Sequence, residues 1–70
     1  MNYHIAIVHR IRATRFFHAL GFADITHMES SVTAAQAPAW PKSGAATQAR
    51  DLRQRFAGLG YRFVLVPSAA

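Results

Sequence analysis

The C-terminal part of the sequence constrains the fold most strongly, because a helix-like segment leads there directly into a strand-like one. Residues 61–66 are β-branched and aromatic with one charge in six residues, which is typical of an inner strand covered on both faces. Before them, apolar residues recur in steps of four and three, which predicts a helix over 45–59 that ends at Gly60. The apolar stripe consists of Ala45, Ala49, Leu52, Phe56 and Leu59. We expect the remainder of the chain to pack around this pair.

The N-terminal third predicts a strand, a helix and a second strand. Residues 3–8 alternate as a strand does. Residues 10–20 predict an amphipathic helix with its arginines outside, followed by an edge strand over about 22–28. The inner face of that helix would consist of Ala13, Phe16, Phe17 and Leu20.

The segment over 29–44 changes composition to Ser, Ala, Gln and Pro, and Trp40 lies between Pro38 and Pro41. A loop of this length is improbable inside so small a domain. We therefore expect a short strand over about 32–36 and an irregular, proline-stiffened connection for the rest.

An internal echo supports a duplicated plan. Residues 17–22 match residues 56–61 at a constant offset, each as a Leu-Gly pair followed by an aromatic residue. Two strand-helix-strand units predict one domain over 1–70 with a ferredoxin-like βαββαβ sandwich, in which two helices cover one face of an antiparallel sheet. A βαβαβ arrangement is the alternative. Because so short a chain buries only about 60% of its unfolded surface, docking onto a partner or homodimerisation through the edge strand would be unsurprising.

The charge of the chain indicates an anionic partner. Seven Arg and one Lys oppose three acids, for a net charge of +5, which favours acidic protein surfaces or nucleic acid. Two helices on one face would gather most of the arginines on one outer surface. The residues predicted to contact the partner are Arg12, Arg15, Arg50, Arg53 and Trp40.

The residues offer little for catalysis or metal binding. The chain contains no cysteine and three acidic residues, and no pair of its four histidines has the i, i+4 spacing of a helical metal clamp. We therefore predict no enzyme activity, metal or cofactor. No apolar run approaches the roughly 20 residues that span a bilayer, so the expected location is the cytoplasm, with no membrane partner.

Two segments resemble known families. Residues 60–66 resemble the RNP1 strand of RNA-recognition motifs, with Arg62 in place of a small residue and Val66 in place of an aromatic one; the alternative is that Tyr61 and Phe63 are core residues. Residues 4–8 and 16–22 together resemble a half-module of the vicinal oxygen chelate (glyoxalase-like) superfamily. This second resemblance implies a metal-ligand role for His4, although the other ligands of that family have no counterpart here.

We expect a small non-enzymatic adaptor or inhibitor that docks an Arg-rich helical face onto an acidic partner. Phage- or plasmid-borne antagonists of host machinery, including anti-CRISPR proteins, are often of this size. The alternatives are a nucleic-acid-binding protein that contacts phosphates and a degenerate glyoxalase-like metal-binding module. Trp40 either caps the core or projects as an anchor for the partner.

Overall fold

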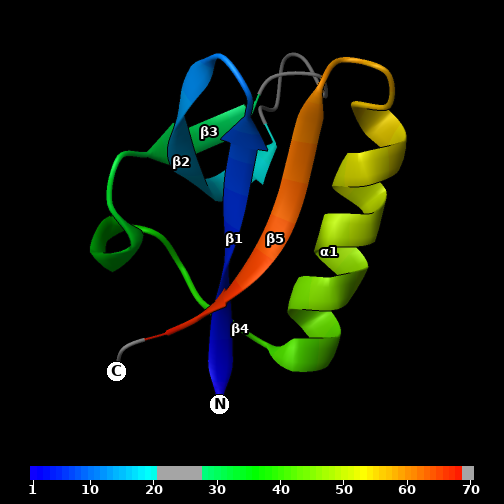
Figure 1. Cartoon of the computed structure of the whole chain (residues 1–70). Coiled ribbons are helices and arrows are strands. Elements are labelled where there is room, and N and C mark those ends of the chain that lie inside the picture. The colour runs from blue at the N-terminus through cyan, green and yellow to red at the C-terminus, as the bar shows by residue number, and fades with distance from the viewer. Residues whose placement is uncertain (21–27, 69–70) are drawn as a thin grey trace.

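The computed structural model describes residues 1–20 and 28–68, which form a small α+β fold with one α-helix on a five-stranded antiparallel sheet (Figure 1). In chain order the elements are β1 (Asn2–His9), β2 (Arg12–Leu20), β3 (Met28–Ser31), a 3-10 helix (Ala34–Gln36), β4 (Trp40–Pro41), α1 (Lys42–Arg55) and β5 (Tyr61–Pro67).

Strand β1 lies at the centre of the sheet and is paired along both edges. One edge pairs with β5 over its whole length, from Tyr3 opposite Pro67 to His9 opposite Tyr61. The other edge is shared, because β2 pairs with the C-terminal half of β1 and the two-residue β4 pairs with its first residues. Strand β3 adds to the outside of β2. The predicted strands over 3–8 and 61–66 are therefore confirmed.

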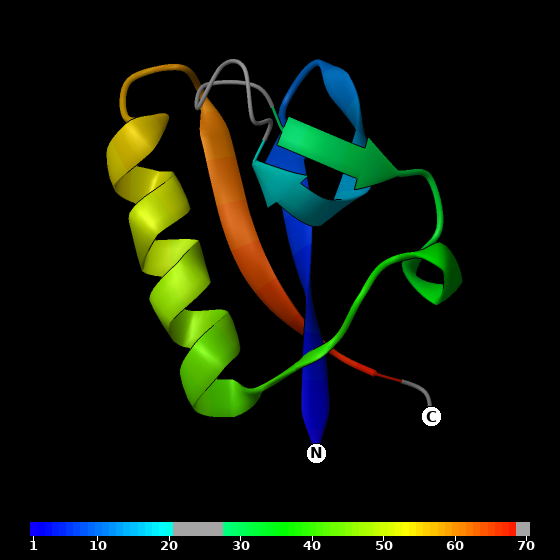
Figure 2. The same ribbon diagram turned by 180° about the vertical axis from the view of Figure 1, so that it is seen from behind.

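A single apolar cluster joins the sheet to α1. The helix contributes Ala49 and Leu52 of the predicted stripe, Phe56 follows directly after the helix, and the predicted stripe residue Leu59 is exposed. The sheet contributes β-branched and aromatic residues from β1, β2 and β5. The buried members are Ile5, Ile7, Phe17, Ala49, Leu52, Phe56 and Phe63. Ile5 and Leu52 are almost fully buried, and burial of each such side chain stabilises the fold by about 2 kcal/mol. Figure 2 shows α1 standing beside β5 in the reverse view, so the helix covers one side of the β1–β5 pair.

The helix predicted over 10–20 is wrong, because residues 12–20 form strand β2. Phe16 and Phe17 fit both periodicities: one is half-buried and the other buried, as expected for alternating faces of a strand. Ala13, which the helical pattern placed inside, is exposed. Pairing with the open edge of β1 supplies backbone hydrogen bonds that override the helical pattern. The short connection between β1 and β2 lacks the Asn-Gly type of turn signal that would have predicted a hairpin.

The ferredoxin-like fold and the βαβαβ alternative are both wrong, since each needs two helices and the described residues contain only α1. The internal echo has no structural counterpart. Residues 17–20 belong to a strand, whereas the matching residues 56–59 follow the end of a helix.

Three further expectations differ from the structure. Among the described residues, strand β5 pairs with β1 alone, so it is an edge strand there, and Arg62 and Val64 are exposed on the face opposite α1. The strand predicted over 32–36 is replaced by the 3-10 helix. The helix predicted over 45–59 begins at Lys42 and ends at Arg55. The edge strand predicted over 22–28 falls almost wholly on residues outside the described ranges.

The turn between α1 and β5 contains two glycines with positive φ, Gly58 at 81° and Gly60 at 83°. The imidazole of His9 closes this turn. Its Nδ1 accepts a hydrogen bond from the Ile11 N–H at 3.3 Å, so Nε2 carries the proton and donates to the Leu59 carbonyl at 3.3 Å. One side chain thus ties the β1–β2 turn to the α1–β5 turn.

We expect Gly60→Ala to destabilise the protein more than Gly58→Ala. Both substitutions force a Cβ onto a positive-φ backbone, at a cost of about 1–2 kcal/mol. A Cβ at Gly58 meets nothing within 4 Å, whereas one at Gly60 lies 3.1 Å from His9 Nε2. Displacing the imidazole also removes a hydrogen bond worth about 1 kcal/mol. Urea denaturation measures both losses.

The same pair of substitutions in a His9→Ala background is the control. Without the imidazole, the two alanine variants should lose similar stability. An unchanged difference in that background would show that His9 does not restrict position 60.

Candidate functional site: a basic groove along strand β5

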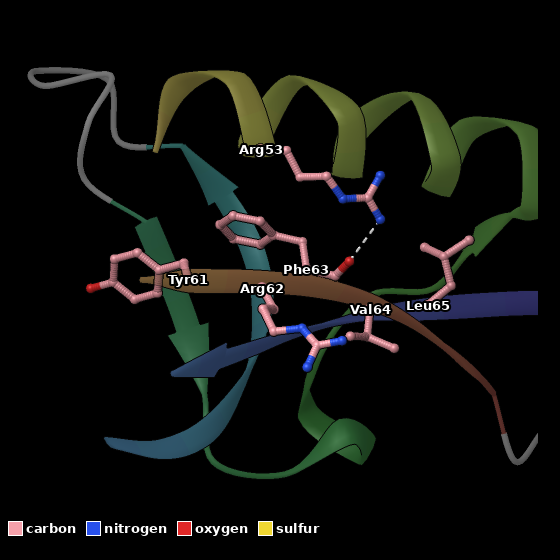
Figure 3. A pocket seen from close by; sticks show the side chains of 6 residues that line it. All are labelled: Arg53, Tyr61, Arg62, Phe63, Val64 and Leu65. Carbon is pink, nitrogen blue, oxygen red and sulfur yellow. Dashed lines mark hydrogen bonds between the residues drawn. The ribbon is translucent and has the colours of Figure 1, made fainter. Parts of the chain in front are cut away.

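A shallow groove of about 340 Å3 follows the edge of β5 that faces away from β1. We call it the β5 groove (Figure 3). It is lined by Arg53 of α1 and by five consecutive residues of β5, namely Tyr61, Arg62, Phe63, Val64 and Leu65. Its lining combines cationic side chains with backbone groups of a strand.

The backbone of β5 directs its hydrogen-bonding groups alternately to its two edges. The Ser68 N–H donates to the Asn2 carbonyl at 2.8 Å, so Ser68 faces β1. Because successive residues of a strand point to opposite edges, Val66, Val64 and Arg62 also face β1. The residues between them face the groove.

Arg53 occupies part of this outer edge. Its Nη2 donates to the Phe63 carbonyl at 2.9 Å, a contact that Figure 3 shows as a dashed line across the groove. Tyr61 and Leu65 present their backbone groups to the same edge as Phe63. Within residues 1–20 and 28–68, no hydrogen bond engages the N–H groups of Phe63 and Leu65. The groove therefore combines unpaired backbone donors with a guanidinium group.

The charge around the groove is uncompensated. In the described part of the chain the one ion pair joins Arg55 Nε to Asp51 Oδ2 at 2.8 Å. Arg50, Arg53 and Arg62 have no carboxylate partner among those residues. The periodicity of the helix places Arg50 next to Arg53 on the surface of α1 and further from the buried stripe. The helix and β5 thus supply a cationic border to an edge that offers backbone donors.

The aromatic residues of β5 face α1. Phe63 is buried, and the Tyr61 ring stacks on it at a centroid distance of 6.2 Å. The Tyr61 hydroxyl accepts a hydrogen bond from Arg12 Nη1 at 3.2 Å. Phe63 is therefore a core residue and Tyr61 packs against the core. The resemblance to RNP1 does not extend to an open stacking platform, which requires rings exposed on the free face of a sheet.

The structure separates the four arginines predicted to contact a partner. Arg50 and Arg53 lie on α1, but Arg12 and Arg15 lie on β2 because that segment is not helical. Arg15 donates through Nε to the Ser30 hydroxyl at 2.7 Å and through Nη2 to the Ser30 carbonyl at 3.0 Å. The two-helix arginine surface is therefore not formed. Contact of these arginines with a partner stays a prediction.

Trp40 packs against the protein's own core. It is half-buried, adjoins the apolar cluster, and lies with its ring centroid 6.1 Å from that of Phe17. This is the geometry of the capping role. A role as partner anchor is not tested by it and stays a prediction.

Three histidines lie within the described ranges, and their burial and contacts differ. His4 is buried and its Nδ1 is 3.0 Å from the Pro38 carbonyl. His9 closes the turns described above. The buried His18 Nε2 has no hydrogen-bond partner among the described residues. Residues 1–20 and 28–68 contain no group of three potential ligands that could hold a metal. His27 lies outside these ranges.

Sequence reasoning did not include Arg62, Val64 and Leu65 in the site. The sequence signal was present, since Arg62 interrupts an otherwise apolar strand, and a charge inside a strand is a common device of edge strands. A single charge is also compatible with an inner strand, so the sequence alone does not place Arg62 at an edge.

We expect Trp40→Ala to lower the unfolding free energy by about 2 kcal/mol, less than the 3–5 kcal/mol typical of a fully buried aromatic residue, because the ring is half-buried. Trp40→Phe should recover most of this loss through its contact with Phe17. Thermal melts followed by circular dichroism provide the measurement. An unchanged melt for Trp40→Ala would refute the capping role.

No protein-family model matches the chain. Comparison with curated proteins and with solved structures likewise gives no significant match. Across the described residues, no helix has the length and apolarity required to cross a membrane. The geometry and charge of the site are therefore the observations that bear on function.

Proposed function

We propose that this protein is a non-enzymatic binding protein, an adaptor or inhibitor that docks the β5 groove and the adjoining arginines of α1 onto an acidic protein surface. The observation that carries the proposal is the charge of the groove. Arg53 and Arg62 line it, and Arg50 is an exposed neighbour on α1. None of the three has a carboxylate partner among the described residues.

Physical chemistry supports an acidic partner. A chain with a net charge of +5 attracts anionic surfaces and accelerates their association. Guanidinium groups favour carboxylates because their planar donors match both oxygens. Arg53 lies at the groove, where its Nη2 donates to the Phe63 carbonyl, so its guanidinium group is within reach of a carboxylate that enters the groove.

Nucleic acid is the competing partner, and it would use phosphate contacts and base stacking. Exposed arginines are available for phosphate contacts. Base stacking on β5 is less favourable, because Phe63 is buried against α1. Phosphate binding by itself weakens steeply as salt rises, which gives the test its discriminating condition.

We predict that Arg50→Gln combined with Arg53→Gln weakens binding to a fluorescein-labelled glutamate peptide about tenfold, because two exposed charge contacts are each worth up to about 1 kcal/mol. Fluorescence anisotropy at low and physiological salt measures the affinity. Labelled duplex DNA and single-stranded RNA are titrated in parallel.

The matched control is Arg10→Gln combined with Arg15→Gln, which removes the same amount of charge from the β1–β2 hairpin and leaves the contact of Arg12 with the groove residue Tyr61 intact. A groove on α1 and β5 predicts a smaller loss for this pair. An equal loss would mean that net charge alone drives binding. Binding of DNA or RNA, but not of the glutamate peptide, at physiological salt would replace the acidic protein surface with nucleic acid.

A further inference from the structure

We infer that the β5 groove recognises its acidic partner by strand addition: an extended acidic peptide segment pairs with the outer edge of β5. This inference rests on the proposed function and specifies its binding mode. It assigns the hydrogen-bonding role to the backbone of Phe63 and Leu65 and the selectivity to Arg53 and Arg62.

Strand β5 has an open outer edge in the described part of the chain. It runs from Tyr61 to Pro67 and pairs there with β1 alone. An edge of this kind is a template for another strand unless the protein protects it. The protection here is partial. Pro67 has no N–H to offer, and Arg53 covers one carbonyl, that of Phe63.

Arg53 protects the outer edge of β5 reversibly. Its contact is a single hydrogen bond from a guanidinium group to a neutral carbonyl. A carboxylate is a stronger acceptor for that group. An incoming acidic side chain can therefore draw Arg53 from Phe63 and free the carbonyl to accept an N–H of the added strand.

The positive charges of Arg53 and Arg62 lie on the two opposite faces of an added strand. Arg53 reaches the edge from α1, whereas Arg62 projects from the opposite face of β5, as Figure 3 shows. Neither has a carboxylate partner among the described residues. Side chains of an added strand alternate between the two faces, so acidic residues find a guanidinium group on either face. Leu65 and the 42% exposed Val64 provide apolar contact for the residues between.

A second copy of the chain fits the edge less well than an acidic peptide does. Two molecules that each carry a net charge of +5 repel one another. Pairing of two β5 strands would also bring the Arg53 and Arg62 side chains of both copies to one seam. Like charges brought together at such a seam are destabilising.

The test uses a labelled hexapeptide of alternating Glu and Val, with acetylated and amidated ends, and a version of it in which every backbone amide is N-methylated. The two peptides share side chains and charge, but the methylated one cannot donate hydrogen bonds to β5. We expect its affinity, measured by anisotropy, to be at least about tenfold lower, the equivalent of one or two lost hydrogen bonds.

Hydrogen exchange followed by NMR localises the contact within β5. We expect the Phe63 and Leu65 amides to exchange rapidly in the free protein and to become protected by the unmethylated peptide. The Val64 amide faces β1 and is the internal control, since it should be protected in both states.

A proline substitution tests one donor of the outer edge. Leu65→Pro removes the outward-facing N–H of residue 65 and no donor that faces β1, and Leu65→Ala controls for the lost side chain. The proline variant should bind the peptide at least about tenfold more weakly than the alanine variant.

Three results would overturn the inference. Equal binding of the two peptides, with no protection of Phe63 and Leu65, would leave a charge-driven function without strand addition. Failure of both peptides to bind at low salt would remove the proposed function as well. A concentration-dependent dimer in sedimentation experiments, with Phe63 and Leu65 protected in the absence of peptide, would assign the edge to a second copy. Because the exchange readout needs only a folded wild-type protein, the inference stays testable if the proline variant does not fold.

Discussion

The pairing of β1 along both of its edges is the interaction on which the rest of the structure depends. Its residues 4–7 are all buried, with Ile5 and Ile7 facing α1 and His4 and Ala6 on the other side. Buried backbone groups must be hydrogen-bonded, and β5 on one edge with β2 and β4 on the other meets that requirement. A helix over 10–20 would have left half of one edge of β1 without a partner.

The position of α1 follows from this arrangement and creates the candidate site. Ala45 and Ala49 are fully buried, and their small side chains let the helix approach the sheet closely. The buried stripe fixes the rotation of α1, and rotation in turn places Arg53 over the outer edge of β5. The groove is therefore a product of core packing, although its functional groups are polar.

The outer edge of β5 can pair with unrelated strands as well as with the proposed partner, so its protection and its proposed binding role compete. A free strand edge favours association with other strands, and a chain of this size buries too little surface to conceal one. Arg53, Arg62 and Pro67 limit indiscriminate pairing by charge and by a missing donor. In the proposed binding mode, the same features select strands rich in carboxylates, for which the positive charges are attractive.

The sequence by itself determined the strands over 3–8 and 61–66, the apolar stripe from Ala45 to Phe56 and the excess of positive charge, since each depends on local periodicity or composition. It did not determine the conformation of residues 12–20, because the pair Phe16 and Phe17 fits a helix and a strand equally well and only the open edge of β1 selects the strand. Tertiary structure also decided that β5 is an edge strand, which sequence cannot show because an apolar run is compatible with both positions in a sheet. The candidate site depends on that decision: the arginines were visible in the sequence, but their placement beside unpaired backbone groups arises only when α1 packs against β5.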